Sequence, residues 1–341
     1  MFKPFQPGSY SFVVAAVCIA GVVGIALMGG KPKPPAEPSD DDPFTAVPTN
    51  VALAGTPKFD AIPFDGRAAF KHLEELCALG PRPSGSPAMV AQRDLIEKHF
   101  TALGAAVERQ TFRVRHPVDG SAVEMTNLIV VWNPQAKERY LVCTHYDTRP
   151  YPDQDRVNPK GRFIGANDGG SSSALLMELG RHMDQLRGKH GVDFIFFDGE
   201  ELVYSERDQY FLGSEYFAKN YRTARLGHRY RQGVLLDMVG DANLNIRQEQ
   251  NSVRLARGVV GDVWGAAARL GVREFQQLAG PTVRDDHLPL NEIARIQTAD
   301  IIDFDYPYWH TEGDTPDKCS ADSLEKVGKV TFEWLRANVN R

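Results

Sequence analysis

Nearly uninterrupted apolar segments that alternate with helical patterns constrain this chain more than any other feature of its sequence. Val192–Phe197 is apolar apart from Asp193, and Val234–Leu236 is the centre of a second such segment. Ser172–His182, which is rich in Ala, Leu and Met, has the pattern of a helix. Strands of this composition are buried on both faces, as in sheets that helices cover on both sides. The sequence therefore predicts an α/β fold.

The chain from residue 64 onward supplies further elements of both kinds. The helical pattern of Asp65–Leu79 ends at Gly80-Pro81-Arg82-Pro83, because glycine and proline interrupt a helix. Further helices are predicted at Ser86–Leu103, Ser214–Lys219 and Asp322–Asn338, and further strands at Glu108–Val114, Asn127–Trp132, Tyr140–Thr144 and Ile296–Ile302. We therefore expect residues 64–341 to form one folded domain.

The N-terminal region is predicted to contain a membrane segment followed by a linker. Phe12–Met28 is almost wholly apolar and uncharged, so residues 1–30 are predicted to anchor the chain in a membrane. A cleaved signal peptide is the alternative. Residues 31–63 are rich in proline and aspartate and include Asp40-Asp41-Asp42, which favours a solvated linker. We expect a membrane-anchored protein whose folded domain is extracytoplasmic, either periplasmic or secreted.

Charge and cysteine content exclude two classes of site. The formal net charge is −5 and no run of Lys and Arg occurs, so nucleic-acid binding is not expected. The cysteines form no CxxC pair, which argues against a zinc site made of thiolates. Cys18 lies in the apolar N-terminal segment, and the other three are Cys77, Cys143 and Cys319. We expect these three to be buried free thiols, although the sequence leaves a disulfide between two of them open.

Five side chains of metal-binding type stand at predicted strand ends or in the adjoining loops. They are His145, Asp168, Glu201, Asp237 and His310. In an open α/β sheet, ligands bind beyond the carboxyl ends of the strands, and zinc accepts imidazole nitrogen and carboxylate oxygen. Each residue taken singly has a structural alternative, and Asp168 could merely cap the helix that follows it. Their joint placement predicts a metal site at one end of the sheet.

The adjacent residues Glu200 and Glu201 suggest two separate roles at this site. Successive side chains of an extended segment point in opposite directions. One of the two glutamates can therefore bind metal while the other faces a substrate as a base.

These residues stand in motifs that resemble those of the zinc aminopeptidases of peptidase family M28. Within that family, the motifs are most similar to those of the glutaminyl-peptide cyclotransferases, and the similarity extends from about Asp65 to the C-terminus. It implies an α/β fold with a mixed, largely parallel central sheet and helices on both faces. The motifs are His145-Tyr146-Asp147, Gly165-Ala166-Asn167-Asp168, Asp198-Gly199-Glu200-Glu201, Leu236-Asp237, Asp285-Asp286-His287 and Trp309-His310-Thr311.

The resemblance to the cyclotransferases implies one zinc ion, which Asp168, Glu201 and His310 would bind. Glu200 would act as general acid and base, moving a proton from the α-amine of an N-terminal glutamine to the departing ammonia. The substrate would be the N-terminus of a peptide or protein, which becomes pyroglutamate.

The resemblance also implies four further site residues, which are Asp237, Asp285, Trp309 and Tyr306. The two aspartates would form a hydrogen-bonded carboxylate pair beside the general base, and the two aromatic residues would wall the substrate pocket. One departure concerns this pocket. Animal cyclotransferases have a tryptophan shortly after the Glu-Glu pair, whereas the aromatic residue of Leu202–Asp208 is Tyr204.

A dinuclear aminopeptidase of the same family is the main alternative. Asp168 would then bridge two zinc ions, with His145 and Asp237 holding the second ion, and Glu200 would activate a bridging water. Asp285 separates the two hypotheses, because it has a defined role only in the cyclotransferase. A third hypothesis, a binding domain without catalytic activity, is disfavoured because every ligand type is present in the sequence.

Overall fold

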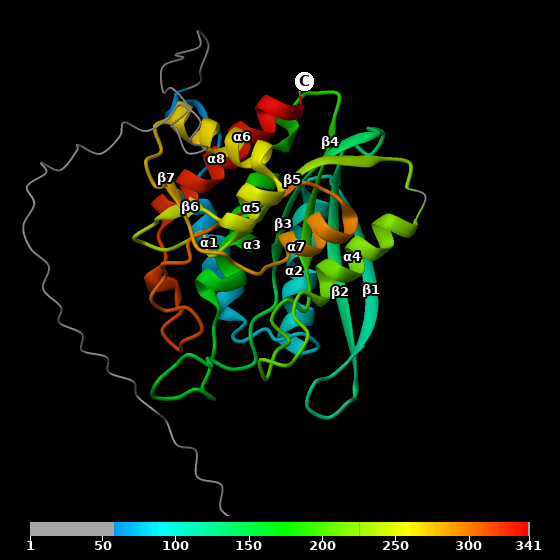
Figure 1. The fold of residues 1–341 in the computed structure, drawn as a ribbon, viewed down its shortest axis with the longest axis vertical. Helices are drawn as coiled ribbons and strands as arrows, with labels where there is room; N and C mark the ends of the chain where they lie inside the picture. Colours follow the sequence, from blue (N-terminus) through cyan, green and yellow to red (C-terminus); the bar gives the residue numbers. More distant parts are fainter. Residues whose placement is uncertain (1–57, 225, 340–341) are drawn as a thin grey trace, which may run out of the picture. The chain divides into compact units, whose positions relative to one another are not determined.

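A six-stranded sheet forms the centre of the computed structural model, which describes residues 58–224 and 226–339 (Figure 1). Its strands lie in the order β1-β2-β4-β3-β5-β8. They are β1 (Ala106–Arg115), β2 (Ala122–Trp132), β3 (Glu138–His145), β4 (Gly191–Phe197), β5 (Arg229–Asp237) and β8 (Thr298–Ile302). A separate two-stranded sheet consists of β6 (Ile246–Gln248) and β7 (Phe275–Ala279).

Parallel pairing dominates the larger sheet. The strands β4, β3, β5 and β8 run parallel to one another, whereas β2 is antiparallel to both β1 and β4. The carboxyl ends of four neighbouring strands therefore meet at one end of the sheet. The predicted mixed, largely parallel sheet is confirmed, and every strand predicted from the sequence overlaps one of its six strands.

Helices cover both faces of this sheet (Figure 1). The longer helices are α1 (Gly66–Ala78), α2 (Pro87–Ala102), α3 (Ser172–Gly180), α4 (Leu212–Thr223), α5 (Gln250–Leu255), α6 (Arg257–Leu270) and α8 (Ala321–Val339). Short turns of helix are η1 (Phe59–Ala61), η2 (Ala166–Ser171), η3 (Met183–Gln185), α7 (His287–Pro289), η4 (Leu290–Ala294) and η5 (Pro316–Lys318). This arrangement confirms the layers that the sequence predicts.

Alternate residues of the central strands supply two separate apolar cores. Val142 and its partner Phe194 pack with residues of α1, α2, α3, α6 and α8, whereas Cys143 and its partner Ile195 pack with residues of α4 and η4. Successive strand side chains point to opposite faces. Burial on both faces explains why these strands are apolar at almost every position.

The first two helices begin at side chains that cap them. Asp65 accepts hydrogen bonds from the amides of Arg67 and Ala68, at 2.9 and 3.2 Å. Ser86 accepts one from the amide of Met89 at 3.1 Å. These amides have no partner within their own helix, so a cap at this position stabilises each helix start. The two helices predicted at Asp65–Leu79 and Ser86–Leu103 are confirmed to within a residue at each end.

The predicted membrane segment Phe12–Met28 lies outside the described residues. The structure describes residues 58–63 of the predicted linker, residues 31–63. Here η1 forms and Ile62 is buried in the core, so the folded domain begins before residue 64. No helix within residues 58–224 and 226–339 is long and apolar enough to cross a membrane.

The cysteines of the folded part agree with the sequence prediction. Cys77, Cys143 and Cys319 are free and buried. Burial is the first cause that raises the pKa of all three thiols. They therefore serve as small apolar side chains in the core.

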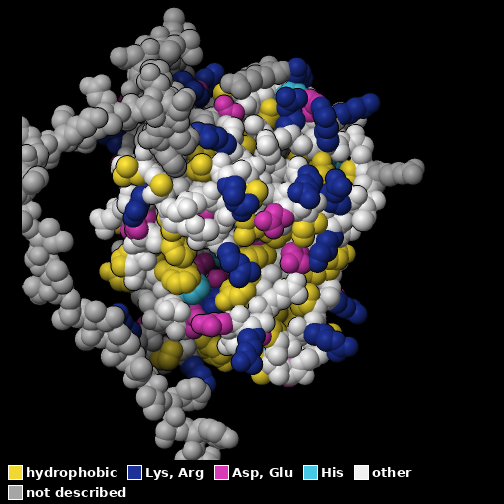
Figure 2. Space-filling view, in the orientation of Figure 1, with side chains coloured by type: hydrophobic (Ala, Val, Ile, Leu, Met, Phe, Trp, Pro, Cys, Tyr) yellow, Lys and Arg dark blue, Asp and Glu magenta, His cyan; other side chains and the backbone are white. Residues whose placement is uncertain are grey.

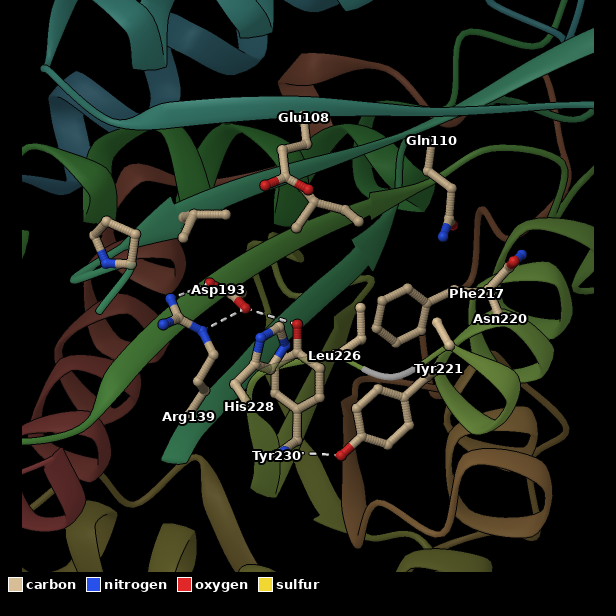
Figure 3. Close-up of a pocket in the computed structure, with 14 residues that line it drawn as sticks. Glu108, Gln110, Arg139, Asp193, Phe217, Asn220, Tyr221, Leu226, His228 and Tyr230 are labelled. Carbon is tan, nitrogen blue, oxygen red and sulfur yellow. Dashed lines mark hydrogen bonds and ion pairs between the residues drawn. The ribbon is translucent and has the colours of Figure 1, made fainter. Parts of the chain in front are cut away.

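A buried ion pair lies at the opposite end of the sheet from the strand carboxyl ends. Arg139 near the start of β3 and Asp193 near the start of β4 are each 1% exposed, and Arg139 Nε donates to Asp193 Oδ2 at 2.8 Å. The hydroxyl of Tyr230 donates to the same oxygen at 2.6 Å. This group borders a cavity of about 290 Å³, and Phe217 and Tyr221 of α4 also line it (Figure 3). Because Arg139, Asp193 and Tyr230 satisfy one another's charge and hydrogen-bonding needs, we infer that this group stabilises the fold.

Asp193→Asn is expected to lower the free energy of unfolding by about 3–5 kcal/mol, because Arg139 would stay buried without its counter-charge. Urea denaturation measures this change. The control, Glu124→Gln, breaks the exposed pair of Glu124 with Arg113, and solvent screening should limit its effect to about 1 kcal/mol or less. Equal losses in the two variants would contradict the assignment.

Candidate metal centre

The carboxyl ends of the parallel strands bring the predicted site residues together. His145 is the last residue of β3 and Asp237 is the last residue of β5, while Glu200 and Glu201 follow β4. All four side chains are buried. Figure 2 shows a histidine and acidic side chains together in a hollow of the molecular surface. The site therefore lies where ligands bind in open α/β sheets.

Asp168, Glu201 and His310 form a first group of ligand atoms that lie within 4.8 Å of one another. His310 Nε2 is 3.2 Å from Glu201 Oε1 and 3.5 Å from Asp168 Oδ2. The sequence predicts these three residues as the ligands of one zinc ion, and the structure brings their ligand atoms together.

His145, Asp168 and Asp237 form a second group within the same limit. His145 Nε2 is 3.2 Å from Asp168 Oδ1 and 3.1 Å from Asp237 Oδ1. Asp168 belongs to both groups, so each of its oxygens faces a different histidine. The arrangement contains the residues that a second metal ion would need.

The donor atoms of these groups fit a divalent metal ion. Oδ2 of Asp168 is buried and has no hydrogen-bond partner among the described residues. Burial and the charge of Glu201 raise the pKa of Asp168. A concentration of buried carboxylates is unfavourable unless a cation compensates it. Imidazole and carboxylate donors in this number suit zinc.

The backbone around Asp168 turns this side chain toward both histidines. Asp168 has φ −80° and ψ 105°, an extended conformation that interrupts the segment η2. Gly169 follows with φ 73°, and a Cβ atom there would approach the carbonyl oxygen of Asp147 and Cε1 of His145 to 2.8 Å. Only glycine fits this position without strain. Ser171, not Asp168, precedes α3 as its N-cap residue, so capping does not account for Asp168.

The carboxylate of Asp147 fixes the turn that carries the two glutamates. Its Oδ1 accepts a hydrogen bond from the amide of Glu200 at 3.2 Å, and its Oδ2 accepts one from the amide of Glu201 at 3.0 Å. Ser84 donates to Asp147 Oδ2 at 3.1 Å. The turn also needs Gly199, which has φ 81°. The two glutamates are thus held at the site by their main chain.

The environments of Glu200 and Glu201 drive their pKa values apart. Burial and the charge of Glu201 raise the pKa of Glu200. Burial opposes ionisation of Glu201 too, but His310 and Arg149 hold its pKa below the ordinary value. Two neighbouring carboxyl groups, one with a raised pKa and one with a lowered pKa, are typical of a general base beside a charged metal ligand.

Asp285 lies among other buried carboxylates. Burial and the charges of Asp237 and Asp286 raise its pKa. Its Oδ1 accepts the amide of Asp286 at 2.6 Å, while Oδ2 is buried without a hydrogen-bond partner among the described residues. Asp237 Oδ1 lies against His145. The expected hydrogen bond between Asp237 and Asp285 is absent from this structure, although the charge of Asp237 helps to raise the pKa of Asp285.

The two aromatic residues predicted for the pocket lie in different surroundings. Trp309 stacks on the ring of His310, with centroids 3.9 Å apart. Tyr306 is 4% exposed, and its hydroxyl donates to Asp314 Oδ1 at 2.8 Å. Trp309 is therefore next to a predicted ligand, whereas Tyr306 reaches the site through Asp314.

Three residues that support the site were given no role by the sequence prediction. They are Arg149, Asp153 and Asp314. Asp314 accepts hydrogen bonds from the amides of Asn167 and Asp168, at 2.8 and 3.2 Å, and so supports the segment of Asp168. Arg149 and Asp153 contact Glu201 and His310. For Arg149 and Asp153, the opposite charges four residues apart were a usable signal, since both lie in the loop that follows the strand of His145.

Comparisons with known proteins point to one family. The sequence model of peptidase family M28 matches residues 127–335. A glutaminyl-peptide cyclotransferase of Drosophila melanogaster is 28% identical over 298 residues, which are 78% of this chain and 81% of that protein.

Solved structures agree with this match. The glutaminyl cyclase of Fimbriiglobus ruber has 42% sequence identity and a TM-score of 0.79, covering 84% of this chain and 99% of that chain. A leucine aminopeptidase precursor from Bacteroides thetaiotaomicron has 32% identity and a TM-score of 0.76, covering 83% of this chain and 99% of that chain. With more than half of its length matched by the family model, this chain belongs to peptidase family M28.

Proposed function

We propose that this protein is a zinc-dependent glutaminyl-peptide cyclotransferase, which converts an N-terminal glutamine of a peptide into pyroglutamate and releases ammonia. The observation that carries the proposal is the buried carboxyl group of Asp285. Its charge contributes, after burial and Glu201, to the raised pKa of Glu200. The resemblance to the cyclotransferases implies a role for this carboxyl group in cyclisation, whereas dinuclear hydrolysis implies none. The similarity to glutaminyl cyclases supports the same function.

Asp168, Glu201 and His310 would hold one zinc ion. When bound, this ion supplies a Lewis acid for the γ-carboxamide oxygen of the glutamine. Glu200 accepts a proton from the α-amine as its nitrogen forms a bond to the γ-carboxamide carbon. The same carboxyl group returns the proton to the carboxamide nitrogen as the bond to that nitrogen breaks. Ammonia leaves and no water is consumed.

Trp309, Asp237 and Asp285 would complete the pocket. Trp309 offers an apolar face beside His310, which suits the methylene groups of the glutamine side chain. Asp237 and Asp285 carry polar groups beside Glu200 that can bind the amine. Tyr306 would support the pocket through Asp314.

Hydrolysis by a dinuclear centre is the second candidate function. The intact group of His145, Asp168 and Asp237 favours it, because these residues would hold the second ion. The similar leucine aminopeptidase precursor points in the same direction. In that case Glu200 would activate water and the product would be a free amino acid.

A peptide with N-terminal glutamine is expected to release ammonia with this enzyme, whereas a chromogenic leucine amide is expected to stay intact. The ring can close only through a free α-amine, so the same peptide with an acetylated N-terminus is the matched control and should release no ammonia. Metal analysis should give one zinc per chain. Hydrolysis of the leucine amide by a preparation with two zinc ions per chain would favour the second candidate.

We also propose that residues 64–341 act outside the cytoplasm, with residues 1–30 as membrane anchor and residues 31–63 as linker. The apolar segment Phe12–Met28 and the proline-rich composition that follows it support this arrangement.

A further inference from the structure

An ion pair beside the metal centre has no part in the reaction described above. Arg149 and Asp153 lie in the loop after β3, and Arg149 Nε is 2.7 Å from Asp153 Oδ1. Nη2 of the same guanidinium donates to Asp153 Oδ2 at 3.2 Å. The side chain of Arg149 is 7% exposed, so it is largely removed from solvent. The charge of Arg149 is therefore weakly screened, whereas Asp153 at the outer side of the pair is 41% exposed.

The guanidinium of Arg149 also binds one of the proposed ligands. Its Nη1 donates to Glu201 Oε2 at 2.8 Å. The other carboxylate oxygen, Oε1, is the one that faces His310 Nε2. A charge-assisted hydrogen bond of this kind is short and directional. Arg149 therefore determines which oxygen of Glu201 is available to a metal ion.

The carboxylate of Asp153 acts on a second proposed ligand. Oδ1 of Asp153 is 3.1 Å from Nδ1 of His310. The contact is an ion pair and not a hydrogen bond. The negative charge of Asp153 still favours the proton on Nδ1, which leaves the lone pair of Nε2 facing Asp168 and Glu201. The amide of Gln154 holds the main chain of His310 as well, donating to its carbonyl oxygen at 3.1 Å. This backbone contact supports the left-handed conformation of His310, φ 53°.

We propose that Arg149 and Asp153 are positioning residues, which together hold Glu201 and His310 in the geometry that a divalent metal ion requires. The proposal rests on the proposed metal site. It explains how the two groups of ligands differ, because the carboxylate beside the second histidine is more distant. Asp147 Oδ1 is 3.8 Å from His145 Nδ1, whereas Asp153 Oδ1 is 3.1 Å from His310 Nδ1. His145 Nδ1 also lies 3.2 Å from the main-chain oxygen of Asp147. The first metal ion should therefore bind at the group of Asp168, Glu201 and His310.

Zinc affinity of the metal-depleted full-length chain tests this proposal without any substrate. Competition with a chromogenic chelator measures it. Arg149→Gln and Asp153→Asn should each weaken zinc binding about 10- to 100-fold, the range typical of residues that orient metal ligands. If the two residues act as one unit, the double variant should bind zinc about as weakly as the weaker single variant.

The visible absorption of the cobalt-substituted protein is a second measurement, which should stay unchanged if the two residues only stabilise the fold. In the variants, the visible absorption of bound Co²⁺ should change, because the bonding of Glu201 and His310 changes. Arg149→Lys should restore part of the affinity, since lysine keeps the charge but cannot bind Glu201 and Asp153 in the same planar geometry. The control is Arg113→Gln, which removes an exposed guanidinium paired with Glu124 and should change neither readout.

Zinc affinity and cobalt absorption that stay unchanged in both single variants would overturn the proposal. If Arg149→Gln does not fold, Asp153→Asn carries the test, because the side chain of Asp153 is 41% exposed. The outcome is independent of the proposed function. Normal zinc binding by the native chain without ammonia release would refute the cyclotransferase and leave the positioning pair intact.

Discussion

Glu200→Gln is expected to lower the rate of ammonia release about 10²- to 10⁴-fold, the contribution typical of a general acid–base group. Glutamine has nearly the same size and shape but cannot accept the proton of the α-amine. The amides of Glu200 and Glu201 should keep their hydrogen bonds to Asp147, because these involve the main chain. Zinc content should therefore match that of the native chain.

Steady-state assays with a glutamine peptide, together with metal analysis of the same preparations, check this expectation. Glu206→Gln is the matched control, since this residue is exposed and lies in the same loop. It should leave both activity and zinc content unchanged. Full activity in Glu200→Gln would refute the assigned base, and loss of zinc from this variant would place Glu200 among the ligands.

The sequence predicts the elements whose local pattern agrees with their packing. The helix α1 has its cap at Asp65 and its apolar residues at helical spacing, and β4 is apolar because it is buried on both faces. The helix α6 is absent from the prediction. Its buried residues include Val263 and Trp264, but Gly258, Gly261 and Gly265 lower its intrinsic helix propensity. Packing against α8 and β7 compensates for this deficit.

The candidate site is predictable where the residue type itself binds metal or protons. His145, Glu201 and Asp237 stand at strand ends, so topology alone brings them together. The contact of Asp314 with Asn167 joins residues 147 positions apart, and no local pattern reveals it. The left-handed backbone of His310 is equally invisible in the sequence. Such contacts depend on how distant loops meet.

Loss of Asp168 is expected to remove metal from both groups of ligands, because its two oxygens face His310 and His145. Asp168→Ala should therefore bind no zinc after dialysis. Without a Lewis acid worth several kcal/mol, ammonia release should fall by about 10³-fold or more. Asp184→Ala, which removes an exposed carboxylate after α3, is the control and should keep both zinc and activity.

Asp237→Ala separates the two metal positions. It removes a residue of the second group alone, so one zinc ion should remain bound at Asp168, Glu201 and His310. If the native chain holds one zinc, metal analysis should give one zinc for Asp237→Ala and none for Asp168→Ala. A native chain with two zinc ions that loses one of them in Asp237→Ala would instead identify a dinuclear centre. Zinc retained by Asp168→Ala would refute the claim that both groups need Asp168 as a ligand, because the remaining residues would then suffice to bind the metal.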